Sequence, residues 1–101
     1  MFIGQANAKI HLLAAIVVII AAIYLNISTL EWCFIVFAIS SVIMAEAFNT
    51  AIEYVVDLCS PEYHELAGKA KDVAAAAVLV AAFGAVGIAC FIFIPKIFPN
   101  L

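Results

Sequence analysis

Charge is scarce in this chain of 101 residues, and arginine is absent. Only 11% of the residues are charged, four as lysine and seven as acids, whereas 69% are apolar and the mean hydropathy is +1.29. A typical soluble domain is about 25% charged and about 45–50% apolar. The lysines are too few for the basic patch by which a protein binds nucleic acid. The composition therefore indicates a membrane protein and argues against a nucleic-acid partner.

Cysteine is also sparse and carries no recognisable pattern. Cys33, Cys59 and Cys90 form neither a CxxC pair nor a metal-ligand spacing. Cysteines of this kind are best interpreted as small apolar side chains within helices.

The length of the chain limits the number of membrane spans, because one span takes about 20 predominantly apolar residues. The chain accommodates three spans with short connections and leaves no room for a soluble domain.

Long runs without charge delimit the spans. No charged residue occurs between Lys9 and Glu31, or between Asp72 and Lys96. The first run exceeds the apolar core of a signal peptide, and no cleavage pattern follows it, so we expect a retained span. The segment between the two runs is equally apolar at its start and carries acids only later. We predict an all-α membrane protein, residues 1–101 forming one domain, with three transmembrane helices at about residues 9–27, 30–58 and 70–95.

Two polar segments predict the connections between the spans. Residues 26–29, Asn-Ile-Ser-Thr, combine turn and N-cap chemistry. Residues 60–62 resemble a helix start, with a serine cap, a proline at the first position and a glutamate near the positive end of the helix dipole. We therefore expect a short interfacial helix or turn over residues 62–71. Pro95 and Pro99 are expected to end the third span.

The lysines predict the orientation. With three spans, the N-terminus and the loop at residues 59–72 share one side of the membrane, which holds Lys9, Lys69 and Lys71, whereas Lys96 lies on the other side. The positive-inside bias makes the side with three lysines cytoplasmic.

The third span is rich in alanine and glycine, which let helices approach closely in lipid. Because three helices give little shelter to buried carboxylates, we also expect a homo-oligomer.

Four polar residues of the middle span share one helical face. At 3.6 residues per turn, Glu46, Asn49, Glu53 and Asp57 fall within an arc of about 80° and extend over about 16 Å of helix axis. A carboxylate at the centre of a membrane costs about 2.5–3.5 kcal/mol and normally faces protein or an aqueous cavity. Glu53 and Asp57 can also be interpreted as reaching solvent at the interface. Glu46 lies seven residues deeper than Glu53, and we expect it to act as a general base.

Acids at two depths suit phosphoryl transfer to a lipid alcohol. A deep base can take the proton of a lipid hydroxyl, while shallower acids hold Mg²⁺ and its nucleotide, because hard cations bind carboxylate and phosphate oxygens together. Lys71 could bind phosphate, and Asp72 could lie near the metal, although each is also explained as a solvated interfacial charge. His11, one turn into the first span, is interpreted as an interfacial residue.

Two runs of sequence carry a family resemblance. Residues 46–57, EAFNTAIEYVVD, and residues 62–72, EYHELAGKAKD, are similar to the prokaryotic diacylglycerol kinases and the related undecaprenol kinases. The similarity covers about Gln5 to Ile94. It implies three membrane helices per chain in a homotrimer of the bacterial inner (cytoplasmic) membrane. It also implies ATP and Mg²⁺ as cofactors, with active sites at the cytoplasmic interface between protomers.

The resemblance also implies a role for each matching residue. Glu46 would be the catalytic base, Asn49 would support the site, and Glu53 would bind metal and nucleotide. The side chains expected beside the nucleotide are Glu62, Tyr63 and His64, with Lys71 and Asp72 reaching its phosphates or ribose.

Two departures from the family pattern concern the nucleotide and metal site. Gln5 stands where the family has a second metal-binding glutamate, so it offers a neutral carbonyl oxygen and weaker Mg²⁺ binding. Family members usually also carry an N-terminal amphipathic surface helix, which at Met1 should already have ended.

Three functions remain open at this point. The leading hypothesis is an ATP- and Mg²⁺-dependent lipid-alcohol kinase. A non-catalytic paralogue, acting as a membrane partner or as a subunit of mixed oligomers, is the alternative. A holin-like pore-former fits only the size and hydropathy. Diacylglycerol and an isoprenoid alcohol such as undecaprenol both present a hydroxyl at headgroup depth, so both fit as acceptor.

Overall fold

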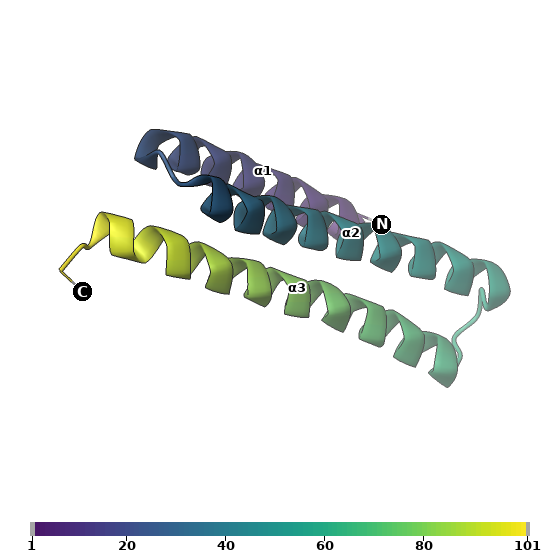
Figure 1. Ribbon diagram of the computed structural model, residues 1–101. Coiled ribbons are helices and arrows are strands. Elements are labelled where there is room, and N and C mark those ends of the chain that lie inside the picture. Colours follow the sequence, from purple (N-terminus) through teal and green to yellow (C-terminus); the bar gives the residue numbers. More distant parts are fainter. Residues whose placement is uncertain (1, 101) are drawn as a thin grey trace.

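Three antiparallel helices make up the part of the chain that the computed structural model describes, residues 2–100 for the backbone and 8–100 for the side chains. They are α1 (Phe2–Leu25), α2 (Thr29–Cys59) and α3 (Glu65–Ile97), in a bundle of 55 × 21 × 19 Å (Figure 1). Each is long and apolar enough to cross a membrane. The predicted all-helical chain with three potential membrane helices is therefore confirmed.

The turn between α1 and α2 follows from its sequence. Asn26 has a φ of +52°, a left-handed conformation that asparagine tolerates better than most residues. Ser28 is the N-cap of α2, and its Oγ accepts a hydrogen bond from the Glu31 N–H at 3.2 Å. The Glu31 Oε1 accepts in return from the Ser28 N–H at 2.9 Å. This reciprocal capping box confirms the turn and cap predicted at residues 26–29.

The helix start predicted at residues 60–62 is wrong. Ser60 is the C-cap of α2, and residues 60–64 form a non-helical loop. Pro61 explains the difference, because a proline disfavours the helical conformation of the residue before it and so ends the preceding helix. The helix α3 begins only at Glu65. Its N-cap is His64, whose Nδ1 accepts a hydrogen bond from the Leu66 N–H at 3.1 Å.

The expectation that Pro95 ends the third span is also wrong, since α3 continues to Ile97. Pro95 has no N–H to donate to the Phe91 carbonyl oxygen, so α3 lacks one hydrogen bond near its end. The last turn is instead held by the Phe98 N–H, which donates to the Ile94 carbonyl oxygen at 2.8 Å. It is further held by an ion pair between Lys96 Nζ and Glu31 Oε1 at 3.1 Å, which joins the end of α3 to the start of α2.

Close packing is concentrated at the end of the bundle near the α1–α2 turn. Ala22, Ile27, Ile35 and Ile92 form a buried cluster there. Most of the large apolar side chains outside this cluster are exposed in the single chain, including Phe91 at 84%. Side chains of this kind require lipid or other protein around them. The N-terminal end of α1 lies beside the middle of α2, so α2 and α3 extend beyond it (Figure 1).

Replacing Ser28 tests the cap. Ser28→Ala should lower the free energy of unfolding by about 1 kcal/mol, because it leaves the Glu31 N–H without its acceptor. Ser28→Asn keeps a capping oxygen and should stay close to wild type. Denaturant titration in detergent micelles measures both variants. Equal stability of Ser28→Ala and Ser28→Asn would contradict the role of the cap.

Candidate functional site

The polar stripe of α2 consists of Glu46, Asn49, Glu53 and Asp57, which share one face because α2 is helical throughout. Burial within the bundle decreases along the stripe. The Glu46 side chain is 12% exposed, whereas that of Asp57 is 48% exposed. Glu53 is half-buried. The stripe therefore offers one sheltered carboxylate and others progressively nearer to solvent.

The sheltered end of the stripe meets α1. His11 Nδ1 and Glu46 Oε1 lie 2.9 Å apart, and the His11 side chain is 24% exposed. The distance suits a hydrogen bond but the angles do not, and neither atom has another hydrogen-bond partner among the described residues. The sequence-based interpretation of His11 as an interfacial residue missed this contact. The available signal was the isolation of His11, because no other side chain between residues 10 and 23 can ionise.

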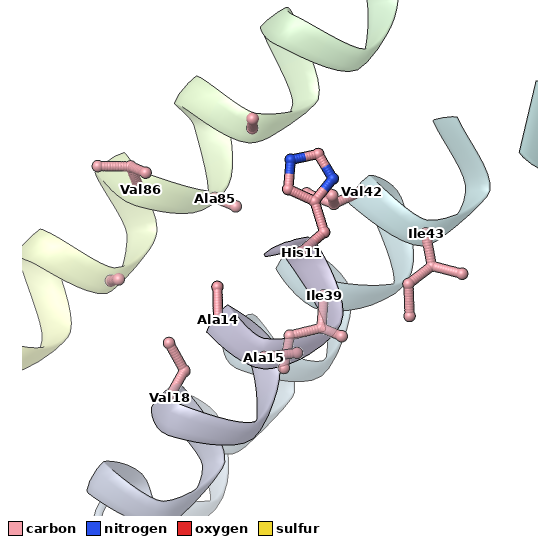
Figure 2. A pocket seen from close by; sticks show the side chains of 11 residues that line it. His11, Ala14, Ala15, Val18, Ile39, Val42, Ile43, Ala85 and Val86 are labelled. Carbon is pink, nitrogen blue, oxygen red and sulfur yellow. The ribbon is translucent and has the colours of Figure 1, made fainter. Parts of the chain in front are cut away.

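An apolar cavity of about 160 Å³ borders the His11 side of this contact. It lies between α1, α2 and α3, and His11 is the one polar side chain among the residues that line it. The side chain of His11 extends from α1 toward the other two helices, above Ala14 and Val18 (Figure 2). From α3 come small side chains, Ala82, Ala85 and Ala89. An apolar chain can therefore occupy this cavity beside His11 without meeting a charge on α3.

Asn49 faces a different space. It lines a wider groove of about 890 Å³ between α2 and α3, whose other polar side chains are Ser41 and Lys69. The Asn49 Oδ1 is buried and has no hydrogen-bond partner among the described residues. A buried amide oxygen of this kind is costly unless a donor reaches it.

The exposed end of the stripe meets α3. Lys71 Nζ donates a hydrogen bond to Asp57 Oδ1 at 2.6 Å, and both side chains are about half exposed. Of the loop and α3 residues predicted to bind nucleotide, Lys71 is thus brought to the stripe. Glu62 and Tyr63 are exposed on the loop, and Asp72 is exposed on α3. Within the described part of the chain, no hydrogen bond or ion pair joins these three side chains to the stripe. The His64 imidazole caps α3.

The described residues do not assemble a metal site from protein ligands alone. No group of three His, Cys, Asp or Glu side chains among them is close enough to hold a metal ion. Gln5, predicted as a second ligand, lies in α1 with its side chain outside the described residues. Mg²⁺ commonly binds through one or two carboxylates together with phosphate oxygens and water. The single half-buried carboxylate of Glu53 fits that mode of binding.

Comparison with known proteins gives consistent similarities. The family model described as prokaryotic diacylglycerol kinase matches residues 1–93. The chain is 40% identical to an undecaprenol kinase of Bacillus subtilis over 93 residues, covering 92% of the chain and 76% of that protein. It is 35% identical to a diacylglycerol kinase of Escherichia coli over 85 residues, covering 84% and 70%. A diacylglycerol kinase of Synechocystis is 39% identical over 97 residues, covering 95% and 55%.

The exposure of the Lys71–Asp57 pair predicts a small contribution to stability. Asp57→Asn should lower the free energy of unfolding by less than about 1 kcal/mol, because solvent screens ion pairs of this exposure. Chemical denaturation in micelles measures it against wild type. A loss of several kcal/mol would show that the pair is a principal support of the α2–α3 hairpin, contrary to this assignment.

Proposed function

Because the chain belongs to the prokaryotic diacylglycerol kinase family, we propose that it transfers the γ-phosphate of MgATP to the hydroxyl group of a membrane lipid. The relatives are named for two acceptors, diacylglycerol and undecaprenol, and the proposal covers both. One observation carries it most strongly. The deepest carboxylate of a membrane helix, Glu46, contacts His11, which lines an apolar cavity, and more exposed acids follow Glu46 along the same face.

In the proposed reaction, the carboxylate of Glu46 accepts the proton of the lipid hydroxyl. The hydroxyl oxygen forms a bond to the γ-phosphorus, and the bond from that phosphorus to the β–γ bridging oxygen breaks as ADP leaves. The apolar walls beside His11 are proposed to accommodate the lipid chain, and the largely buried side chain of Glu46 has little access to water. Asn49, one turn further along the stripe, is proposed to support the site through its amide, whose Oδ1 has no partner among the described residues.

The more exposed end of the stripe is proposed to bind the nucleotide. Glu53, with Gln5, would hold Mg²⁺, which when bound neutralises negative charge on the phosphate oxygens. Lys71 is a mobile point charge that can exchange the Asp57 carboxylate for phosphate. Glu62, Tyr63, His64 and Asp72 lie at this same end of the bundle and are proposed to contact the rest of the nucleotide.

Assembly and orientation complete the proposal. We place the polar end at the cytoplasmic face of the bacterial inner membrane, where ATP is available. We further propose a homotrimer with active sites between protomers. The extensive exposed apolar surface of α1, α2 and α3 supports a chain that packs against further copies as well as lipid.

A direct assay tests the function. Purified chain in lipid bicelles with Mg²⁺ and radiolabelled ATP should phosphorylate diacylglycerol or undecaprenol when each is supplied separately. Helical circular dichroism establishes that the protein is folded. Folded protein that labels neither lipid above background would overturn the proposal and favour a non-catalytic membrane partner.

Two isosteric substitutions separate the proposed roles along the stripe. Glu46→Gln should lower kcat by about 10²–10⁴-fold with little change in nucleotide affinity, because it removes the base that accepts the proton. Glu53→Gln should mainly raise the KM for MgATP, because it removes a charged metal ligand. Steady-state kinetics and nucleotide binding measure both variants. Equal losses of nucleotide affinity in the two would contradict this division of roles.

A further inference from the structure

We propose that His11 is a positioning residue for Glu46, with its Nδ1–H donating a hydrogen bond that orients the carboxylate toward the acceptor hydroxyl. This inference rests on the proposed kinase function and assigns a role in the site to a further residue of α1. The supporting contact is the 2.9 Å separation of His11 Nδ1 and Glu46 Oε1.

The distance between His11 Nδ1 and Glu46 Oε1 allows a hydrogen bond once the two groups are aligned. A separation of 2.9 Å is the usual length of an N–H···O hydrogen bond. The angular misalignment is typical of catalytic contacts before substrate binds, which align only in the reactive complex. Both atoms are buried and have no alternative partner within the described residues. Since a buried donor and a buried acceptor are each costly when unpaired, alignment of the two atoms into a hydrogen bond would remove both costs.

The surroundings make Glu46 the one charged group facing His11 among the described residues. The helix α3 contributes alanine and valine at this level and carries no charged side chain between Asp72 and Lys96. The nearest charged residue of α1 among those described is Lys9, which is exposed. From α2, Glu46 is the titratable side chain in contact. An ionised carboxylate in such apolar surroundings needs a donor, and His11 is the donor present.

A neutral imidazole donates from one nitrogen and accepts at the other. Bonding to Glu46 therefore selects the tautomer with its proton on Nδ1. This leaves Nε2 as an acceptor. A side chain with a different donor position will not reproduce the contact, and that difference makes the proposal testable.

Three substitutions of His11 distinguish the donor from other roles. The amide nitrogen of asparagine falls near the place of Nδ1, that of glutamine falls near Nε2, and leucine has no donor. His11→Leu and His11→Gln should lower kcat by about 10²-fold or more with unchanged KM for MgATP, whereas His11→Asn should stay within about tenfold of wild type. Lys9→Gln, on the exposed surface of the same helix, is the matched control and should behave as wild type.

The kinetic outcomes decide between the alternatives. Wild-type activity in His11→Leu would overturn the proposal. Equal losses in the Asn, Gln and Leu variants would also overturn it, because the imidazole would then act through its packing. Activity retained in His11→Asn alone supports the donor role, because a purely structural contact would not predict that difference between the variants.

A spectroscopic measurement tests the pair independently of catalysis. The chain has two histidines, so a His64→Gln background leaves His11 as the single imidazole in a ¹⁵N NMR spectrum. Glu46→Gln should shift the Nδ1 resonance, whereas Glu53→Gln should leave it in place. An unchanged resonance in Glu46→Gln would overturn the pairing even if the lipid kinase assay succeeds. A wild-type chain that phosphorylates no lipid would overturn the proposed function instead.

Discussion

The Glu46 carboxylate lies on a membrane helix and must be stabilised by other groups of the protein. The arrangement of the three helices around it follows from this requirement. Glu46 lies on an α2 face that packs against α1, away from ready solvation, and an ionised acid there must find a donor within the protein. The helix α1 brings His11 to it, and α3 presents only small apolar side chains at the same level. The result is a polar contact beside an apolar cavity that His11 lines, an arrangement that suits a reaction between a lipid hydroxyl and a nucleotide.

The two ends of the bundle differ in how firmly their helices are held together. At the α1–α2 turn, the capping box of Ser28 and Glu31, the Glu31–Lys96 ion pair and a buried apolar cluster fix the helices together. At the other end, the described residues offer a half-exposed ion pair and an open loop. Stability is thus concentrated away from the polar stripe. Segments that bind ligands are generally drawn from the less stable parts of a protein.

Much of this arrangement was predictable because it is local in sequence. Two uncharged runs located α1 and α3, the apolar segment between them located α2, and a constant helical step placed Glu46 and Asp57 on one face. The start of α3 was mispredicted because Ser60 before Pro61 suits a helix end as well as a helix start, and the actual cap is His64. Pro95 was misjudged because a last turn can lose one hydrogen bond. The His11–Glu46 contact depends on the register between α1 and α2. A local sequence pattern does not determine that register, so the contact was not predicted. The family resemblance, based on two long polar runs, is confirmed by the family model.

The central claim is that the lipid hydroxyl reacts beside Glu46. A structure of the protein in a bilayer with diacylglycerol or undecaprenol and a non-hydrolysable ATP analogue tests it most directly. The account predicts the acceptor oxygen within hydrogen-bond distance of the Glu46 carboxylate, with the nucleotide phosphates toward Lys71. An acceptor hydroxyl bound out of reach of Glu46, with the phosphates elsewhere than at the exposed end of the stripe, would contradict the account.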